Sequence, residues 1–166
     1  MVVRVFIGLG SNLDNPCDQL QQATKALQNL RLTQYCQCSS FYSSTPMGPQ
    51  DQDDFINAVV EINTELTPLE LLNELQVIEH QQGRVRLKHW GPRTLDLDIL
   101  IFGDTIIQTD DLVIPHPGLA ERNFVLYPLA ELVNKDFNVP GKGKLNKLMQ
   151  QVSADGLTKL EMNNEF

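Results

Sequence analysis

The order of strand-like and helix-like patterns is the feature that most constrains what this chain can fold into. Apolar residues alternate along 2–9, which predicts a strand, and Asn15-Pro16 then predicts the start of a helix with Asn15 at its N-cap. Residues 32–43 have the composition of an extended segment, and alternating apolar residues predict a further strand at about 55–63. The first part of the chain is therefore predicted as strand, helix, strand, strand.

A second helix and a fourth strand complete this order. Thr67-Pro-Leu-Glu70 has the form of a capping box with proline in the first turn, and Gly83 is a natural helix end. Leu95 to Phe102 is the predicted fourth strand, and Gly103-Asp104 predicts a hairpin into a short strand at 105–108. The order βαββαβ predicts an α+β fold with a ferredoxin-like core, to which the last third of the chain adds strands and helices.

Length and composition are those of one globular domain, which we place over residues 1–166. Apolar residues make up 42% of the chain and charged residues 20%, a balance that argues against disorder. Apolar runs fall short of the roughly eighteen residues of a membrane-spanning helix, so we predict no membrane association. The three cysteines form no CxxC pair, which favours reduced thiols in a cytoplasmic protein. Cys36 and Cys38, two apart on a predicted strand, are expected to point the same way.

Charge argues against one broad class of function. The net charge of −8 and the sequence pI of about 4.7 are unlike those of a general nucleic-acid binder, which needs a positive surface. Against this acidic background, basic residues gather in one short stretch: Arg84, Arg86, Lys88, His89 and Arg93. The stretch predicts a basic loop suited to a small anionic ligand.

Asp96-Leu-Asp98 is the strongest single indication of chemistry. Side chains two apart on a strand face the same way, with their backbones roughly 6.5 Å apart. Two carboxylates in that arrangement can share a pair of Mg²⁺ ions, whose remaining ligands are phosphate oxygens and water. Strict alternation predicts that Leu100 and Phe102 share the aspartates' face and that Ile101 lies on the other. A polar face turned to solvent is the alternative for this motif taken alone.

The basic stretch lies directly before the aspartates. Guanidinium groups such as those of Arg84 and Arg93 bind phosphate oxygens through paired hydrogen bonds, so the combination favours a phosphate-plus-metal site. Gly83 and Gly91-Pro92 favour a mobile loop that closes over a substrate. A solvated basic loop is the alternative.

Three further segments contain candidate ligand-binding residues. His116 and Arg122 form a second basic pair, although a lone histidine between prolines is more often structural. Phe55 and Phe124 are candidates for stacking on a flat ring whose edge Asn57 would recognise, with an ordinary core role as the alternative. Gly8-Leu-Gly-Ser-Asn12 lacks the spacing of a phosphate loop and is interpreted as a strand-to-helix turn.

Together these segments resemble the 6-hydroxymethyl-7,8-dihydropterin pyrophosphokinase family of folate biosynthesis. The stretch from Trp90 to Ile99, Trp-Gly-Pro-Arg-Thr-Leu-Asp-Leu-Asp-Ile, is the most specific part of the resemblance. It is accompanied by further matching segments: Gly10-Ser-Asn-Leu13, Ser39-Ser-Phe-Tyr42, Gly48-Pro-Gln-Asp-Gln52, Phe55-Ile-Asn-Ala58, Glu79 to Arg86, and Pro115-His116. Phe55 stands where we associate a tyrosine with the family, and the chain after about 135 matches weakly.

The resemblance implies a reaction and a cofactor. The pterin hydroxymethyl oxygen would attack the β-phosphorus of ATP, and AMP would leave. Asp96 and Asp98 would hold two Mg²⁺ ions, and Arg84 and Arg93 would neutralise charge on the transferred group.

The resemblance also implies two sets of binding residues. The set for ATP comprises Gln76, Glu79, Arg84, Arg86, Trp90, Arg93, Ile99, His116 and Arg122. The set for the pterin comprises Ser44, Thr45, Pro46, Met47, Phe55, Asn57, Trp90, Asp96 and Phe124. These two small molecules are the expected partners of a monomer.

Two other functions remain as alternatives on the sequence. One is a ferredoxin-like module that binds a nucleotide or metal without turnover; we would expect such a module to lack the dicarboxylate. The other is a Mg²⁺-dependent nucleotidyl transferase, which would release pyrophosphate from ATP rather than AMP.

Overall fold

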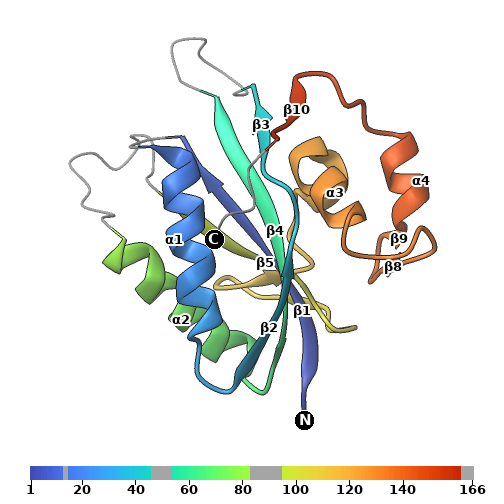
Figure 1. Ribbon diagram of the computed structural model, residues 1–166. Helices are drawn as coiled ribbons and strands as arrows, with labels where there is room; N and C mark the ends of the chain where they lie inside the picture. Colours follow the sequence, from blue (N-terminus) through green and yellow to red (C-terminus); the bar gives the residue numbers. More distant parts are fainter. Residues whose placement is uncertain (13–14, 46–53, 83–94, 162–166) are drawn as a thin grey trace.

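One six-stranded sheet organises the protein. The computed structural model describes residues 1–12, 15–45, 54–82 and 95–161 (Figure 1). The first part of the chain supplies these elements in order: β1 (Val3–Ser11), α1 (Pro16–Gln28), β2 (Thr33–Cys38), β3 (Tyr42–Ser44), β4 (Phe55–Thr64), α2 (Pro68–Gln81) and β5 (Asp96–Phe102). Both predicted helices are present, and the second predicted strand is divided into β2 and β3.

The last third of the chain adds smaller elements, as expected. They are β6 (Ile107–Gln108), β7 (Val113–Ile114), a 3₁₀ turn (Leu119–Glu121), α3 (Asn123–Ala130), β8 (Asn138–Val139), β9 (Gly143–Lys144), α4 (Leu145–Gln150) and β10 (Leu157–Lys159). The main sheet has the order β10-β3-β4-β1-β5, with β2 also pairing with β4, and all pairs are antiparallel. The predicted hairpin after Gly103-Asp104 is wrong, because β6 pairs with β7 in a separate small sheet.

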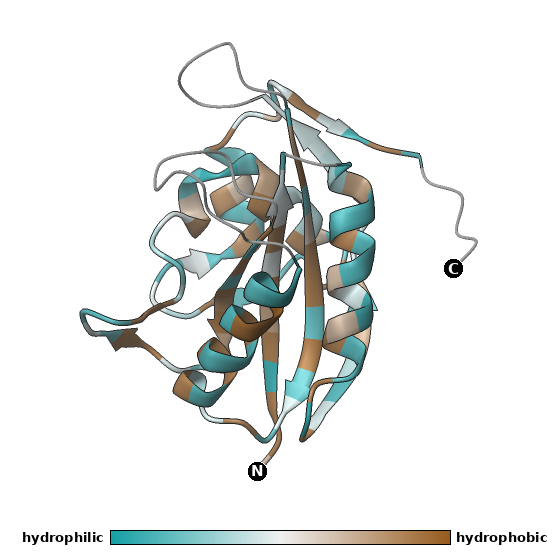
Figure 2. Ribbon diagram, turned by 90° about the vertical axis from the view of Figure 1, so that its left-hand side faces the viewer, coloured by the Kyte–Doolittle hydropathy of each residue, from teal (hydrophilic) through white to brown (hydrophobic). Residues whose placement is uncertain are grey.

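The two faces of the main sheet are covered by different helices. α1 and α2 lie on one face, and α3 and α4 lie on the other (Figure 1). Alternation along β1 explains this division, since Val5, Ile7 and Leu9 pack with the first pair of helices whereas Phe6 packs with the second. In Figure 2 the long central strands are largely hydrophobic, whereas the helices have hydrophobic and hydrophilic bands. The mixed helix and sheet class predicted from the sequence is confirmed.

The two predicted helix starts have different local structures. At α2, the Thr67 hydroxyl accepts the Glu70 N–H at 3.2 Å and the Glu70 carboxylate accepts the Thr67 N–H at 2.9 Å, so the capping box is confirmed. At α1, Asn15 occupies the N-cap position but has left-handed backbone angles (φ 59°, ψ 71°) and makes no side-chain cap. The predicted N-cap position of Asn15 and the start of α1 at Pro16 are therefore confirmed.

A β-bulge in β5 changes which residues face the two layers. Asp96 and Asp98 pair with Gly10 and Gly8, but the register shifts before Ile101, which pairs with Phe6. Leu100 is the extra residue, so Leu100 and Ile101 both face α3, and Phe102 faces α1 and α2. The strict alternation predicted for this strand is correct for Leu100 and wrong for Ile101 and Phe102.

A second irregularity separates two cysteines. The β2–β4 register shifts between Tyr35 and Gln37, and Cys38 packs against the core under α1, where burial raises its pKa to about 11. Cys36 is exposed and its sulfur accepts a hydrogen bond from the Asn63 amide at 3.3 Å. The two side chains lie on opposite faces, contrary to the prediction. All three thiols are free, as expected.

Glu131, at the end of α3, connects that helix to the edge of the sheet. Its carboxylate accepts the Ser40 N–H at 2.8 Å and the Tyr42 hydroxyl, and it lies 3.6 Å from the Lys159 ammonium. Partial burial opposes the charge on Glu131, but the two hydrogen bonds and the lysine outweigh it and lower its pKa below 4.5. Burial, and after it the contact with Glu131, raises the pKa of Tyr42, which stays a neutral donor.

We expect Glu131→Gln to lower the free energy of unfolding by about 1.5–3 kcal/mol at pH 7, as for other hydrogen bonds to charged groups. A carboxyl whose pKa is lower in the folded state stabilises the protein above its unfolded pKa, and this stabilisation is lost as pH falls through the folded value. The difference from wild type should therefore shrink below about pH 4.5. Urea titrations across this range measure it, with the exposed Glu65→Gln as control. A difference that is the same at pH 7 and pH 3 would contradict this assignment.

None of the described helices combines the length and the apolar character needed to span a bilayer.

Candidate active site

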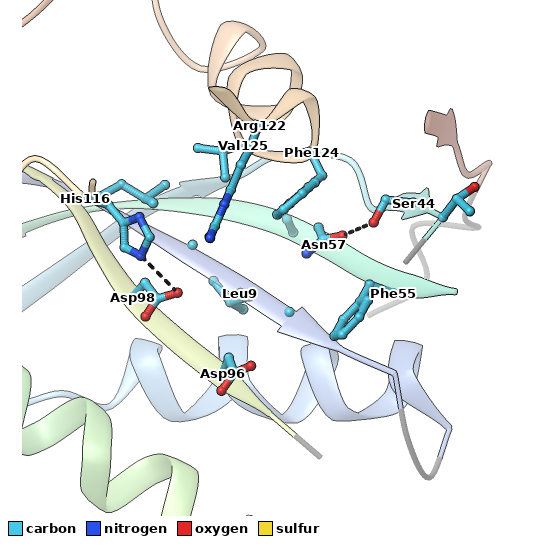
Figure 3. A pocket seen from close by; sticks show the side chains of 15 residues that line it. Leu9, Ser44, Phe55, Asn57, Asp96, Asp98, His116, Arg122, Phe124 and Val125 are labelled. Carbon is cyan, nitrogen blue, oxygen red and sulfur yellow. Dashed lines mark hydrogen bonds and ion pairs between the residues drawn. The ribbon is translucent and has the colours of Figure 1, made fainter. Parts of the chain in front are cut away.

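A cavity of about 290 Å³ opens on the part of the sheet next to α3. Its walls come from β1, β3, β4, β5 and the segment that leads into α3 (Figure 3). Its lining residues include nine that the sequence predicted: Ser44, Thr45, Phe55, Asn57, Asp96, Asp98, His116, Arg122 and Phe124. These residues are far apart in the chain, so the fold brings them together at one place.

Two glycines of β1, Gly8 and Gly10, form the floor of the cavity. A Cβ at Gly10 would lie 3.0 Å from the Asn57 amide nitrogen, and one at Gly8 would lie 3.2 Å from the Leu100 side chain. Glycine at these two positions leaves room for the Asn57 and Leu100 side chains, which a Cβ would crowd. The interpretation of this segment as a strand-to-helix turn is wrong, because β1 continues to Ser11 and both glycines lie within it.

Asp96 and Asp98 face the cavity from the same side of β5. Asp98 is half exposed, with 51% of its side chain accessible, and its carboxylate lies 3.8 Å from Nε2 of His116 (Figure 3). Asp96 pairs with Gly10 and Asp98 pairs with Gly8, so each carboxylate lies beside a residue that has no side chain. The predicted shared orientation of the two aspartates is present in the structure.

His116 is held by its backbone and by one ring nitrogen. Its N–H donates to the Leu100 carbonyl at 3.0 Å, and its Nδ1 accepts the Gly118 N–H at 3.1 Å. Burial lowers the pKa of His116, the positive charges of Arg122 and Lys142 act in the same direction, and Asp98 opposes them. The neutral ring is favoured, and its proton lies on Nε2, the nitrogen that faces Asp98.

Arg122 and Phe124 enter the cavity from the start of α3. The Arg122 guanidinium lies 5.7 Å from the centre of the Phe124 ring, within the range of a cation–π contact. Gly118 makes room for this arginine, because a Cβ there would lie 2.6 Å from its Nε. A cationic group is thereby placed on the same side of the cavity as His116 (Figure 3).

The opposite end of the cavity offers neutral hydrogen-bonding groups. The Ser44 hydroxyl donates to Oδ1 of Asn57 at 2.8 Å, and both side chains are buried. This bond fixes the amide so that its nitrogen is directed toward the cavity (Figure 3). Phe55 and Phe124 add aromatic surface next to it. A flat, polar heterocycle is the kind of ligand that such a wall can bind.

Other predicted residues lie elsewhere. Glu79 is buried on α2, and its carboxylate accepts the Leu97 N–H at 2.7 Å, which holds β5 in place. Gln76 is exposed on α2, and Ile99 lines an adjoining hollow of about 260 Å³ together with Asp98 and His116. Six predicted residues lie outside the described part of the chain: Pro46, Met47, Arg84, Arg86, Trp90 and Arg93.

Sequence reasoning missed several lining residues. They are Gly8, Leu9, Gly10, Ala58, Leu100 and Val125. Gly8 and Gly10 could have been identified from the sequence. Two glycines at alternate positions of an otherwise apolar strand often mark a place where a ligand or another backbone comes close to the strand. Leu100 and Val125 have no chemical signal, and their role depends on the bulge and on the placement of α3.

The donor set suits a divalent cation that also binds phosphate. Within the described ranges, no group of three or more His, Cys, Asp or Glu side chains could hold a metal ion by itself. Mg²⁺ needs few protein carboxylates when phosphate oxygens and water complete its shell, so Asp96 and Asp98 fit it.

The family model described as 7,8-dihydro-6-hydroxymethylpterin-pyrophosphokinase (HPPK) matches residues 6–134. The chain belongs to this family. Two HPPK relatives are named 2-amino-4-hydroxy-6-hydroxymethyldihydropteridine pyrophosphokinase. The chain is 49% identical to the Haemophilus influenzae protein, over 96% of this chain and 99% of that one. It is 45% identical to the Pseudomonas aeruginosa protein, over 96% and 98%. The family resemblance identified from the sequence is confirmed.

Solved HPPK-DHPS structures share the fold. Plasmodium falciparum HPPK-DHPS in complex with pteroate superimposes with a TM-score of 0.72 at 14% identity, covering 91% of this chain and 42% of that one. The same protein with SDX-DHP gives 0.71, covering 96% and 47%. The present chain therefore spans less than half the length of these HPPK-DHPS chains, and the likeness concerns the fold alone.

Proposed function

We propose that the chain transfers the pyrophosphoryl group of ATP to the hydroxymethyl oxygen of 6-hydroxymethyl-7,8-dihydropterin, a step of folate biosynthesis. A bond forms between the hydroxymethyl oxygen and the β-phosphorus, the bond from the β-phosphorus to the oxygen that it shares with the α-phosphate breaks, the hydroxyl proton is released to solvent, and AMP leaves with the shared oxygen. One observation carries the proposal beyond family membership: a single cavity joins two carboxylates to a ring-binding wall at one end and a basic pair at the other. Both substrates and the cation that links them therefore have complementary groups in one place.

The pterin is assigned to the neutral end of the cavity. The Asn57 amide, oriented by Ser44, is placed to recognise the polar edge of the ring, and Phe55 and Phe124 are placed to pack on its faces. Thr45 lines the same wall, and Pro46, Met47 and Trp90 are added on the family resemblance. The hydroxymethyl group would then point toward Asp96.

ATP is assigned to the side of His116 and Arg122. Arg122 offers charge to the phosphates, whereas the neutral His116 ring offers an Nε2 proton. Ile99 lines the adjoining hollow, which is suited to the nucleoside. Gln76, Glu79, Arg84, Arg86, Trp90 and Arg93 complete the set on the family resemblance, with Arg84 and Arg93 on the transferred group.

Asp96 and Asp98 are the proposed ligands of two Mg²⁺ ions. When bound, the ions would neutralise the triphosphate and polarise its oxygens, the chemistry on which phosphoryl transfer mainly depends. The two carboxylates themselves act by position, since β5 holds them on one wall between the two substrate ends. Asp98 lies 3.8 Å from His116 Nε2, on the side of the cavity assigned to ATP.

We also propose that the core is ferredoxin-like and that the enzyme acts as a cytoplasmic monomer. The strand order β3-β4-β1-β5, with α1 and α2 on one face, supports the fold assignment. The free thiols support the cellular location, and the nine predicted residues that one chain brings together around the cavity support the monomer.

Product analysis tests the function. With ATP, Mg²⁺ and the hydroxymethyl dihydropterin, we expect AMP and the pterin diphosphate in equal amounts, and little AMP when the pterin is omitted. Chromatography of the nucleotides and pterins measures both products. Release of pyrophosphate instead of AMP would indicate a nucleotidyl transferase, and tight binding without any product would indicate a binding module.

A further inference from the structure

The C-terminal part of the chain contacts the cavity wall although it lies beyond the family match. The match ends at residue 134, whereas β10 pairs with β3 through Leu157 opposite Ser44 and Lys159 opposite Tyr42. In Figure 1, β10 lies beside β3 and close to α3. The segment 153–160, which we call the C-terminal brace, therefore contacts an element that lines the proposed pterin site.

The brace binds Thr45 through a turn at Gly156. The Gly156 carbonyl accepts the Thr45 N–H at 3.1 Å and lies 3.4 Å from the Thr45 hydroxyl, which also donates to it. Gly156 has a φ of +78°, a left-handed conformation that favours glycine, and a Cβ there would lie 3.3 Å from the Thr45 hydroxyl oxygen. The turn thus approaches Thr45 closely, on the β3 side of the cavity.

Asn123 connects the same turn to α3. Its side-chain amide donates to the Ser153 carbonyl at 2.9 Å and to the Asp155 carbonyl at 3.0 Å. It is the first residue of α3 and stands between Arg122 and Phe124, which both line the cavity. One amide group therefore holds two carbonyls that lie one to three residues before Gly156.

Two more hydrogen bonds hold the turn in place. The Ser153 hydroxyl accepts the Asp155 N–H at 3.0 Å, and the Tyr127 hydroxyl donates to the Val152 carbonyl at 3.3 Å. The turn is therefore closed on itself and is also held by the second turn of α3. A displacement at Asn123 would be transmitted to Gly156 and from there to Thr45.

We propose that Asn123 is a positioning residue for the pterin site. Through the C-terminal brace it fixes the wall that contains Phe124 against the wall that contains Ser44 and Thr45. The ring would bind between these walls, so their separation determines how well both can contact it at once. The inference rests on the proposed function and adds to it a part of the chain that the family match does not reach.

Two variants of Asn123 test the inference. Asn123→Ala removes both donated hydrogen bonds. Asn123→Asp keeps the size of the side chain, removes both donors, and turns a carboxylate oxygen toward the two carbonyls that the amide held. From the usual worth of two such bonds, we expect each variant to weaken pterin binding about tenfold and to change ATP binding less than about twofold.

A matched control uses the same residue type and the same kind of bond. The Asn29 amide donates to the Lys25 carbonyl at 3.1 Å at the end of α1, away from the cavity. Asn29→Ala should leave both ligand affinities unchanged. Isothermal titration with the pterin and, separately, with a non-hydrolysable ATP analogue measures these affinities.

Amide hydrogen exchange gives a readout that does not require turnover. The Thr45 amide is expected to exchange faster in both Asn123 variants than in wild type and in Asn29→Ala. Wild-type pterin affinity in folded Asn123→Ala or Asn123→Asp, or equal weakening of pterin and ATP, would overturn the positioning role. Failure of the wild-type protein to form AMP would instead overturn the proposed function, while Thr45 exchange would still report on the brace.

Discussion

Asp96→Ala and Asp98→Ala are each expected to reduce kcat on the order of 10³-fold or more, because charge neutralisation supplies most of the catalysis of phosphoryl transfer. Both carboxylates face the cavity, and Asp98 is half exposed, so their removal should leave the melting temperature close to that of wild type. AMP formation at saturating substrates and millimolar Mg²⁺ measures kcat, and a thermal melt checks the fold.

Asp104→Ala is the matched control, because Asp104 is an exposed carboxylate just after the same strand and outside the cavity. It should retain wild-type kcat. Near-normal turnover by either cavity variant at ordinary Mg²⁺ would refute the metal assignment, whatever the melting temperature.

Gly10→Val is expected to weaken pterin binding about 5- to 150-fold, the equivalent of the roughly 1–3 kcal/mol that overpacking costs. A Cβ at this position would already lie 3.0 Å from the Asn57 amide nitrogen, and valine adds two methyl groups. Valine is favoured in strands, so backbone propensity does not itself predict a loss of stability. Titration with the pterin and with an ATP analogue measures the two affinities.

A graded series sharpens this second test. Gly10→Ala should fall between wild type and Gly10→Val in pterin affinity, since it adds the Cβ alone. Gln34→Val, an exposed strand position in β2 outside the cavity, should bind both ligands as wild type does. Unchanged pterin affinity in Gly10→Val would show that the floor of the cavity does not contact the ring.

Local patterns predicted most of the elements, because they depend on neighbours in the sequence. The capping box at Thr67 and the alternation of β1 are complete within a few residues, and both are present. The aspartate pair was found for the same reason, since two positions on one strand share a face without any tertiary information. The family resemblance then connected this pair to the segments around Asn57, His116 and Phe124.

Features that depend on pairing between distant strands were not predictable in this way. The partner of β6, the register shifts in β2 and β5, and the addition of β10 to the sheet edge all require knowledge of which strands meet. The left-handed Asn15 follows from the path of the chain into α1 rather than from its side chain. The contacts of residues 153–160 with β3 and with Asn123 are also a tertiary effect.

Leu100, the additional residue in β5, supports the site through its backbone, so the number of residues in this strand matters as well as their side chains. Leu100 stands between Ile99 and Ile101, which pair with Ile7 and Phe6, so its carbonyl is available to the His116 N–H. Deleting this one residue would leave the aspartates and Ile101 opposite their present partners in β1. It would nevertheless remove the acceptor that holds the His116 backbone and the side chain that packs beside Gly8. A homologue could therefore retain every polar side chain of the site and still lose its geometry through a single gap in an alignment.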